Sequence, residues 1–405
     1  MLPCMLSRST LWVSVAVRYP GYLGVGLATC NPGERPGTCR AYAHAVAGNS
    51  SWARARGRIE AICAEFHDDR SLRLQVLGVL REVIGFDAYV WLLTDPVTAV
   101  GVAPLADVPC LTELPALIRA KYATTINRWT ILRLQSSPAG TLSDAVRGDL
   151  SRSLMWRDIL SRYGIGDVAS AVFADQLGCW GFLDLWRSDT SAPFSAAEAG
   201  FLAEVAAPLA TALRQCQART FVDPATSHRP DLGPVVLMLD DDLRIASRTA
   251  ASRAWLDALL PPEPDQKAIP ASVYNVAAQL LAVENGVDAH PAFARTHLAD
   301  GFWLALRAAR LSADQPLTDR AATIVVTIEE ASASERLELF GRAFGLSVRE
   351  YELFGLLATG CDTRTMARQM SLSEHTIQDH LKSIFAKTGA HDRVTVLSRA
   401  LGTRR

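Results

Sequence analysis

A group of polar side chains near the C-terminus repeats with the spacing of one helical face. Glu374, Gln378 and Lys382 follow one another at intervals of four residues. His375 and Asp379 lie directly beside them in the same pattern. Carboxamide, carboxylate and ammonium groups can all hydrogen-bond to base edges in the major groove of DNA. The chemistry that this cluster predicts is therefore recognition of duplex DNA.

The opposite side of the same segment is apolar. Ile377, Leu381 and Ile384 recur at intervals of three and four residues, which predicts an amphipathic helix with one buried side. Ser373 precedes this helix and is a suitable N-cap. Because the major groove admits one α-helix, we expect helix 373–388 to present its polar face to the bases.

Two shorter helices are predicted to position this one. Ser347 and Glu350 have the spacing of a capping box, and Asp362 is a suitable cap for the second helix. Only Ser371–Leu372 separates the second helix from Ser373, so the two helices must cross steeply, as in a helix-turn-helix. The positions expected to face inward are Leu353, Phe354, Leu357, Met366, Ala367 and Met370.

Basic residues are concentrated in this part of the chain. The whole chain of 405 residues has a net charge of −1. Ten Lys or Arg and six Asp or Glu lie between Phe340 and Arg405, which gives this segment +4 and residues 1–339 −5. A local positive charge is what contact with phosphates requires.

The segment from Leu346 to about Ala400 resembles the C-terminal four-helix DNA-binding domain of the LuxR/GerE regulators. The motif reads L-S-x-R-E-x-E-L, A-x-G, A-R-x-M-x-L-S-x-x-T-I-x-x-H-L-x-x-I-x-x-K-x-G-A and R. The positions that carry the resemblance are Glu350, Gly360, Ala367, Ser373, Thr376, His380, Leu381, Ile384, Lys387, Gly389 and Arg393.

The resemblance implies roles for individual residues. It places Gln378, Asp379 and Lys382 against bases. It places five residues against phosphates: Arg364, Ser373, His375, Thr376 and Lys387. It also implies a homodimer, paired through a fourth helix at about 391–402 by Val394, Leu397 and Leu401. Many members have a lysine where Gln378 stands, so we expect an altered sequence preference.

The rest of the chain divides into segments of different composition. We predict a multidomain protein in which two α+β sensor domains, one resembling GAF and one resembling PAS, precede an all-α four-helix domain. The first sensor is expected to contain a strand at Ala88–Leu93, a hairpin turning at Asp175–Gly178 and a helix capped by Ser195. The segments are a disordered extension (1–54), the GAF-like domain (55–216), a linker (217–233), the PAS-like domain (234–330) and the helix-turn-helix domain (339–405).

The expected strands of the PAS-like domain are Val235–Leu239, Leu243–Ala246, Phe302–Leu311 and Ala322–Ile328, with helices at about 249–260 and 271–284.

Motifs for enzymatic chemistry are absent from the sequence. It contains no Gly-Lys pair and so no P-loop, no C-x-x-C, and no cysteine between Cys216 and Cys361 for a flavin adduct. His290 or His297 could ligate haem, although lone histidines are more often structural. We therefore expect no catalytic activity, no cofactor and no metal. No apolar run has the roughly 18 residues of a membrane span, and we expect a cytoplasmic protein.

These observations predict a one-component transcription regulator that binds double-stranded DNA as a dimer. A small-molecule effector or a partner at the N-terminal domains would modulate it, and the transcription machinery would be its further partner. Two alternatives remain open. The N-terminal domains could bind proteins and no small ligand, or residues 55–330 could be an enzyme fused to a DNA-binding tail.

Overall fold

The computed structural model describes residues 36–65, 68–222, 235–259, 270–298, 303–311 and 323–402. Two compact units divide the chain, Met1–Arg54 and Ala55–Arg405. Residues 1–35 of the predicted disordered extension lie outside the described residues. Residues 36–54, in contrast, belong to helix α1 (Pro36–Glu65). Four alanines between residues 41 and 47 favour this helix, because alanine has the highest helix propensity.

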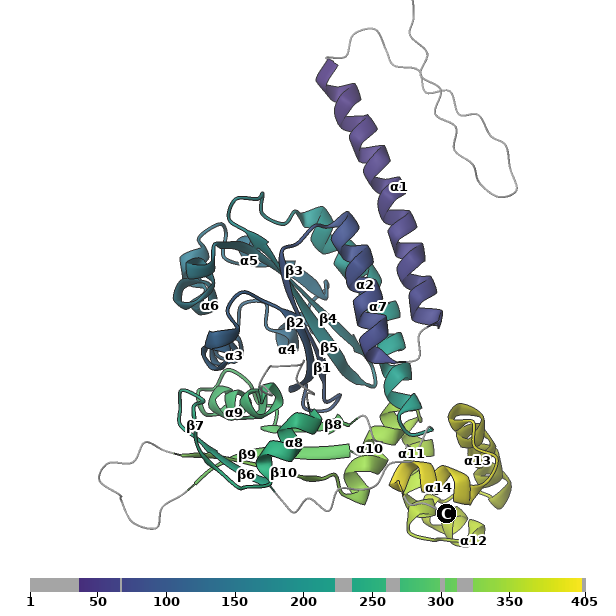
Figure 1. Cartoon of the computed structure of the whole chain (residues 1–405). Helices are drawn as coiled ribbons and strands as arrows, with labels where there is room; N and C mark the ends of the chain where they lie inside the picture. The colour runs from purple at the N-terminus through teal and green to yellow at the C-terminus, as the bar shows by residue number, and fades with distance from the viewer. Residues whose placement is uncertain are drawn as a thin grey trace, which may run out of the picture. The chain divides into compact units, whose positions relative to one another are not determined.

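The first sheet contains five antiparallel strands in the order β2-β1-β5-β4-β3 (Figure 1). They are β1 (Ala88–Thr94), β2 (Gly101–Asp107), β3 (Ala139–Thr141), β4 (Ile165–Asp175) and β5 (Gly178–Ser188). The predicted hairpin is confirmed, since Asp175 pairs with Gly178 across the turn between β4 and β5. The Asp175 carboxylate stabilises this turn by accepting hydrogen bonds from the backbone N–H groups of Leu177 and Gly178. Strands β2 and β3 were not predicted from the sequence.

Helices cover both faces of this sheet. On one side lie α2 (Asp69–Val83) and α7 (Ala196–Arg219) (Figure 1). Other helices connect the strands: α3 (Leu114–Ala123), α4 (Trp129–Leu132), α5 (Leu142–Ala145) and α6 (Leu154–Asp158), with 3-10 turns at Leu111–Glu113, Leu150–Arg152 and Leu160–Tyr163. The predicted Ser195–Glu198 capping box begins α7.

Helix α7 alone among the described helices is long and apolar enough to span a membrane. Its apolar residues, including Phe201, Val205 and Leu209, are instead buried, and the helix packs against β4 and β3.

The second sheet is also five-stranded and antiparallel, in the order β7-β6-β10-β9-β8. Its elements are β6 (Val235–Leu239), β7 (Ile245–Arg248), α8 (Ser252–Leu259), α9 (Ala271–Glu284), β8 (Phe293–His297), β9 (Trp303–Arg310) and β10 (Ile324–Glu330). Strand β8 was missing from the sequence prediction, because Phe-Ala-Arg-Thr-His lacks a clear apolar alternation.

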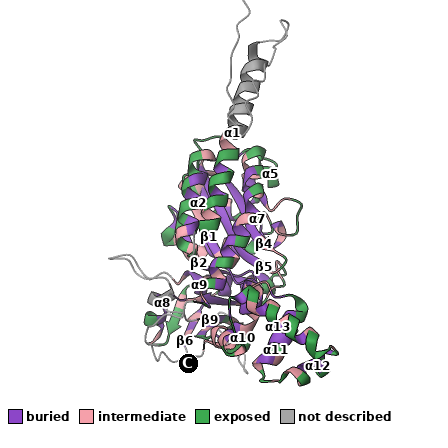
Figure 2. Ribbon diagram, turned by 90° about the vertical axis from the view of Figure 1, so that its right-hand side faces the viewer, coloured by how far each residue is buried: buried purple, intermediate pink, exposed green. Residues whose placement is uncertain are grey.

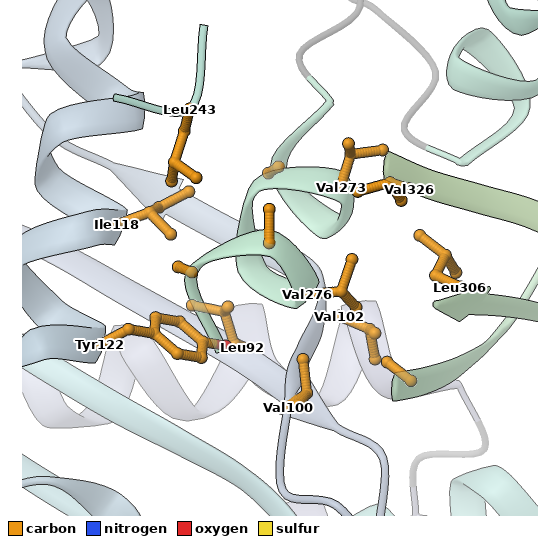
Figure 3. Packing of buried hydrophobic residues seen from close by; sticks show 14 of the residues in the cluster. Leu92, Val100, Val102, Ile118, Tyr122, Leu243, Val273, Val276, Leu306 and Val326 are labelled. Atoms are coloured by element: carbon orange, nitrogen blue, oxygen red, sulfur yellow. The ribbon is translucent and has the colours of Figure 1, made fainter. Parts of the chain in front are cut away.

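One hydrophobic core joins the two sheets through α9. Val273 and Val276 of α9 belong to the same buried cluster as Leu92 in the first sheet and Val326 in the second. Figure 3 shows these side chains converging on α9, with Tyr122 of α3 at the edge of the cluster. The two sheets therefore share a packed interior.

Five helices form the C-terminal part: α10 (Ala333–Ala343), α11 (Val348–Ala358), α12 (Thr363–Met370), α13 (Glu374–Thr388) and α14 (Arg393–Leu401). The sequence did not predict α10, which begins with a capping box of Ser332 and Glu335.

Phe221, just beyond α7, stacks on Trp303 of β9 with ring centroids 5.3 Å apart and meets Phe340 of α10 edge to face at 5.4 Å. Residues 217–219 of the predicted linker therefore belong to α7, and its Phe221 is a packed aromatic residue. Its residues 223–233 lie outside the described part of the chain.

A buried arginine joins both sheets to α10. Arg295 on β8 pairs with Asp95, which follows β1, at 2.7 Å between Nε and Oδ2, and both side chains are fully buried. Its Nη1 also lies 2.8 Å from Oε2 of Glu338 on α10. Because two charges buried together must stay paired, Arg295 fixes three parts of the chain at one point.

Candidate nucleic-acid interface

Each helix of the C-terminal domain begins at a side chain that caps it. The Ser347 and Glu350 capping box is present at α11. Asp362 accepts from the Thr365 N–H at α12, and Ser373 accepts from the Thr376 N–H at α13. All three predicted caps are confirmed. They satisfy backbone donors that the first turn of a helix leaves free.

The turn between α12 and α13 is tight. Ser371 adopts a left-handed conformation with φ of 55°, and the Leu372 N–H donates to the Ala367 carbonyl at 2.9 Å. This bond closes α12, and the next residue, Ser373, already caps α13. The geometry is that of a helix-turn-helix.

The apolar side of α13 is buried as predicted. Ile377, Leu381 and Ile384 are at most 1% exposed. They pack in one cluster with the six predicted inward positions of α11 and α12, all of which are buried. Figure 2 shows exposed residues along the other side of α13. The helix is therefore held by its apolar face and leaves its polar face to solvent.

The exposed face of α13 has a short chain of ionisable side chains. The Asp379 carboxylate lies 3.1 Å from Lys382 Nζ and 3.6 Å from His375 Nε2. The hydrogen bond from Lys382 holds the pKa of Asp379 below its usual range. Exposed pairs of this kind contribute little stability, so their partners can be exchanged for bases or phosphates at small cost.

Gln378 is exposed beside these charges and is linked to α12. Its Nε2 lies 3.5 Å from Thr363 Oγ1, which also accepts from Arg393 Nη2 at 2.7 Å. Thr363 thus connects the predicted base-reading amide to the start of α14. Arg393 lies on the family pattern, and no role was predicted for it.

Lys387, a predicted phosphate contact, is engaged inside the domain. Its Nζ lies 2.5 Å from Glu350 Oε2 and 3.0 Å from the Gly345 carbonyl. Ser383 also donates to Glu350 at 2.5 Å. Burial would raise the pKa of Glu350, but the hydrogen bonds from Lys387, Ser383 and Ser347 lower it to about 2. One buried carboxylate therefore caps α11 and anchors α13. The capping-box motif located Glu350, but nothing in the sequence indicated its second role.

The remaining predicted site residues lie on the surface of the domain. Arg364, Ser373 and His375 are exposed, and Thr376 is half-buried. On α14, Val394 is 54% exposed, whereas Leu397 and Leu401 are half-buried. These three positions fall on one helical face by their spacing. Their role in pairing two protomers stays a prediction.

The described residues include no group of three or more His, Cys, Asp or Glu side chains that could hold a metal ion.

Comparison with known proteins identifies the class of this domain. Residues 345–400 match the family described as bacterial regulatory proteins of the luxR family. The segment is a helix-turn-helix domain, and within that class it is the C-terminal domain of the LuxR family.

A curated relative is the monoamine regulon transcriptional regulator of Klebsiella aerogenes, 37% identical over 54 residues. The match covers 13% of this chain and 24% of the relative, so the chain spans about a quarter of that protein's length.

Solved structures align over longer stretches at lower similarity. Escherichia coli SdiA is 13% identical, covers 86% of this chain and 96% of its own, and has a TM-score of 0.28. A structure of SdiA in complex with octanoyl-rac-glycerol is 14% identical, covers 85% and 93%, and has the same TM-score of 0.28. The VqmA dimer of Vibrio cholerae is 16% identical, covers 42% and 83%, and has a TM-score of 0.18.

Proposed function

We propose that this protein is a transcription regulator that binds duplex DNA through α13. The observation that carries the proposal is the division of α13 within a LuxR-family domain: its apolar side is buried and its polar side is exposed. Gln378 can bond adenine with both its donor and its acceptor, and Asp379 can accept from cytosine. Lys382 adds a charge for guanine or phosphate.

The sequence preference is expected to depend on the Asp379 carboxylate. Asp379 neutralises part of the charge of Lys382 in the free protein and lies beside the His375 ring. Base pairs that present a hydrogen-bond donor to Asp379 would be favoured. A base carbonyl at the same position would be repelled by the carboxylate.

Capture of genomic DNA fragments tests this proposal. The full chain is compared with the Gln378→Ala/Lys382→Ala variant, with Arg152→Ala as a control that removes an exposed charge far along the chain from α13. We expect the wild type and the control to enrich the same discrete sites and the double variant to lose them. Equal enrichment by all three proteins would show that α13 does not read DNA.

Regulation is assigned to the region of the two sheets, which we propose to be GAF-like and PAS-like sensors in a cytoplasmic homodimer. The five-stranded antiparallel sheets with covering helices support this assignment. An effector would change how the two copies of α13 are presented to successive major grooves. Analytical ultracentrifugation of the full chain with and without operator DNA tests the dimer, and a monomer in both conditions would contradict it.

A further inference from the structure

Arg393 occupies the first position of α14, where a positive charge is unfavourable for the helix. Free N–H groups give the N-terminus of a helix a partial positive charge, which favours acids and disfavours cations. The guanidinium reaches another helix, where Nη2 donates to Oγ1 of Thr363 at 2.7 Å across 30 positions of the sequence. Among the described residues, no carboxylate forms an ion pair with it. Arg393 therefore acts through its contact with Thr363 and not by stabilising α14.

Thr363 is the first residue of α12 and connects Arg393 to α13. A guanidinium has five donors and no acceptor, so the Thr363 oxygen must accept in this bond. Both side chains are half-buried, and the bond is charge-assisted. Bonds of this kind are stronger than those between neutral groups, and partial burial strengthens them further. The Thr363 hydroxyl is therefore fixed in position relative to both α12 and α14.

Gln378 is the exposed side chain next to this hydroxyl. Its Nε2 lies 3.5 Å from Thr363 Oγ1, and the two residues are 15 positions apart on the two helices of the helix-turn-helix. This distance is longer than an ordinary N–H···O hydrogen bond, so the amide is directed by Thr363 but can still turn to a base. A free glutamine side chain loses much rotamer freedom when it binds. An amide that is already oriented loses less, which favours binding in that one orientation.

The contact also decides which groups of the amide are free. The Nε2 group has two hydrogens, and one of them faces Thr363. The second hydrogen and the Oε1 acceptor remain available together, and adenine matches this pair with its N7 acceptor and N6 donor. The reversed amide would present two donors, which suits the N7 and O6 acceptors of guanine. The observed orientation therefore favours adenine.

We propose that Arg393 is a positioning residue for base recognition. Through Thr363 it orients the Gln378 amide and makes the domain prefer adenine at the base pair that Gln378 contacts. The proposal rests on the proposed function, because it requires α13 to lie in the major groove. Arg393 itself contacts neither base nor phosphate in this arrangement.

Selection from a random DNA library with the full chain tests the effect on specificity. The base pair at which Gln378→Ala loses its preference is the one that Gln378 contacts. We expect the wild type to prefer adenine there by about tenfold, as is usual for a bidentate contact. Thr363→Val and Arg393→Met should reduce this preference to about threefold or less and leave the other positions of the site unchanged. Thr363→Ser keeps the hydroxyl and should retain the preference.

Two controls accompany the selection. Arg349→Met removes an exposed arginine of α11 that is paired with Glu352, and it should leave the adenine preference unchanged. Melting curves show that each variant is folded. Full adenine preference in Thr363→Val or in Arg393→Met would overturn the proposal. An equal loss of affinity for all sequences would also overturn it, because that result is typical of a phosphate contact.

A measurement without DNA separates this proposal from the proposed function. In nuclear magnetic resonance spectra of the full chain with isotope-labelled glutamine, the side-chain amide signals missing from Gln378→Ala belong to Gln378. These signals should shift in Thr363→Val and in Arg393→Met and stay in place in Arg349→Met. Unchanged signals in the first two variants would overturn the positioning role. Shifted signals with a wild type that selects no sites would contradict the proposed function, and with it the adenine preference, but not the orientation of the amide.

Discussion

The charged groups of α13 and those of the junction around Arg295 differ in their surroundings. On α13, Asp379 and Lys382 are 54% and 72% exposed. At the junction, Asp95 and Arg295 are both fully buried. Exposed charges interact weakly and change partners easily, whereas buried charges are costly to separate. The first set is suited to exchanging partners with DNA, and the second to holding the helix-turn-helix domain against the sheets.

The largest expected effect is at the junction. Asp95→Ala leaves Arg295 buried with only Glu338 as a charged partner, so the unfolding free energy should fall by about 3–5 kcal/mol. Scanning calorimetry of the full chain measures this as a lower Tm. Glu352→Ala removes an exposed partner of Arg349 and serves as the control, with a change of about 0.5 kcal/mol. An equal decrease in Tm for Asp95→Ala and Glu352→Ala would show that the buried pair is no more stabilising than an exposed one.

The second-largest effect on stability is expected at Glu350, a buried carboxylate within the helix-turn-helix domain. Glu350→Gln weakens the bonds from Lys387 and Ser383 and should cost about 2 kcal/mol at neutral pH. The folded pKa is about 2 and the ordinary value is 4.5, so the carboxylate stabilises the fold fully above pH 4.5. This contribution is lost as the pH falls from 4.5 toward 2.

Melting curves of both proteins across this range measure the difference. The wild type and Glu350→Gln should converge in stability as the solution becomes acidic. If the stability difference between the two proteins were constant from neutral pH to pH 2, the charge of Glu350 would not be the cause of that difference.

A smaller effect, on binding alone, is expected at Lys382. Lys382→Ala should weaken operator binding about tenfold and reduce the salt dependence, because one phosphate or guanine contact is lost. Fluorescence anisotropy at several salt concentrations measures it. The Tm should be unchanged, since Lys382 is exposed and its pair with Asp379 contributes little. A large decrease in Tm would show that Lys382 stabilises the fold, as Arg295 and Asp95 do.

The smallest effect is expected at Asp379. Asp379→Asn removes a negative charge from the face of α13, so affinity for unrelated DNA should rise by about threefold. Its low pKa keeps the carboxylate charged throughout the neutral range, so this rise should not depend on pH between 6 and 8. Selection from a random DNA library would show whether specificity falls as affinity rises. An unchanged preference would assign Asp379 no part in reading bases.

The two regions also differ in what the sequence could predict. The caps at Ser347, Asp362 and Ser373 and the buried stripe of α13 follow from local spacing, and the structure has them where expected. The element order of both sheets was partly predicted, but strands β2, β3 and β8 were not. Their side chains are fixed by partners distant in the chain, and local alternation is a weak signal for such strands.

Contacts between distant residues were not accessible to sequence reasoning. Arg295 and Asp95 are separated by 200 positions, and the pairing of Lys387 with Glu350 spans 37. No sequence spacing predicts either pair, because only the folded chain brings the two partners together. For the same reason, the buried pair of Lys121 and Asp184 was not predicted.

The placement of the lysines has a consequence for chemical footprinting. The chain has four lysines, at positions 121, 267, 382 and 387. The side chain of Lys382 is 72% exposed. Lys387 is 36% exposed and donates to Glu350, and Lys121 is 10% exposed and paired with Asp184. An amine-acylating reagent in limiting amount would therefore modify Lys382 well before Lys121. Mass spectrometry of this reaction would report DNA occupancy at Lys382 and opening of the buried pair at Lys121 in the same sample.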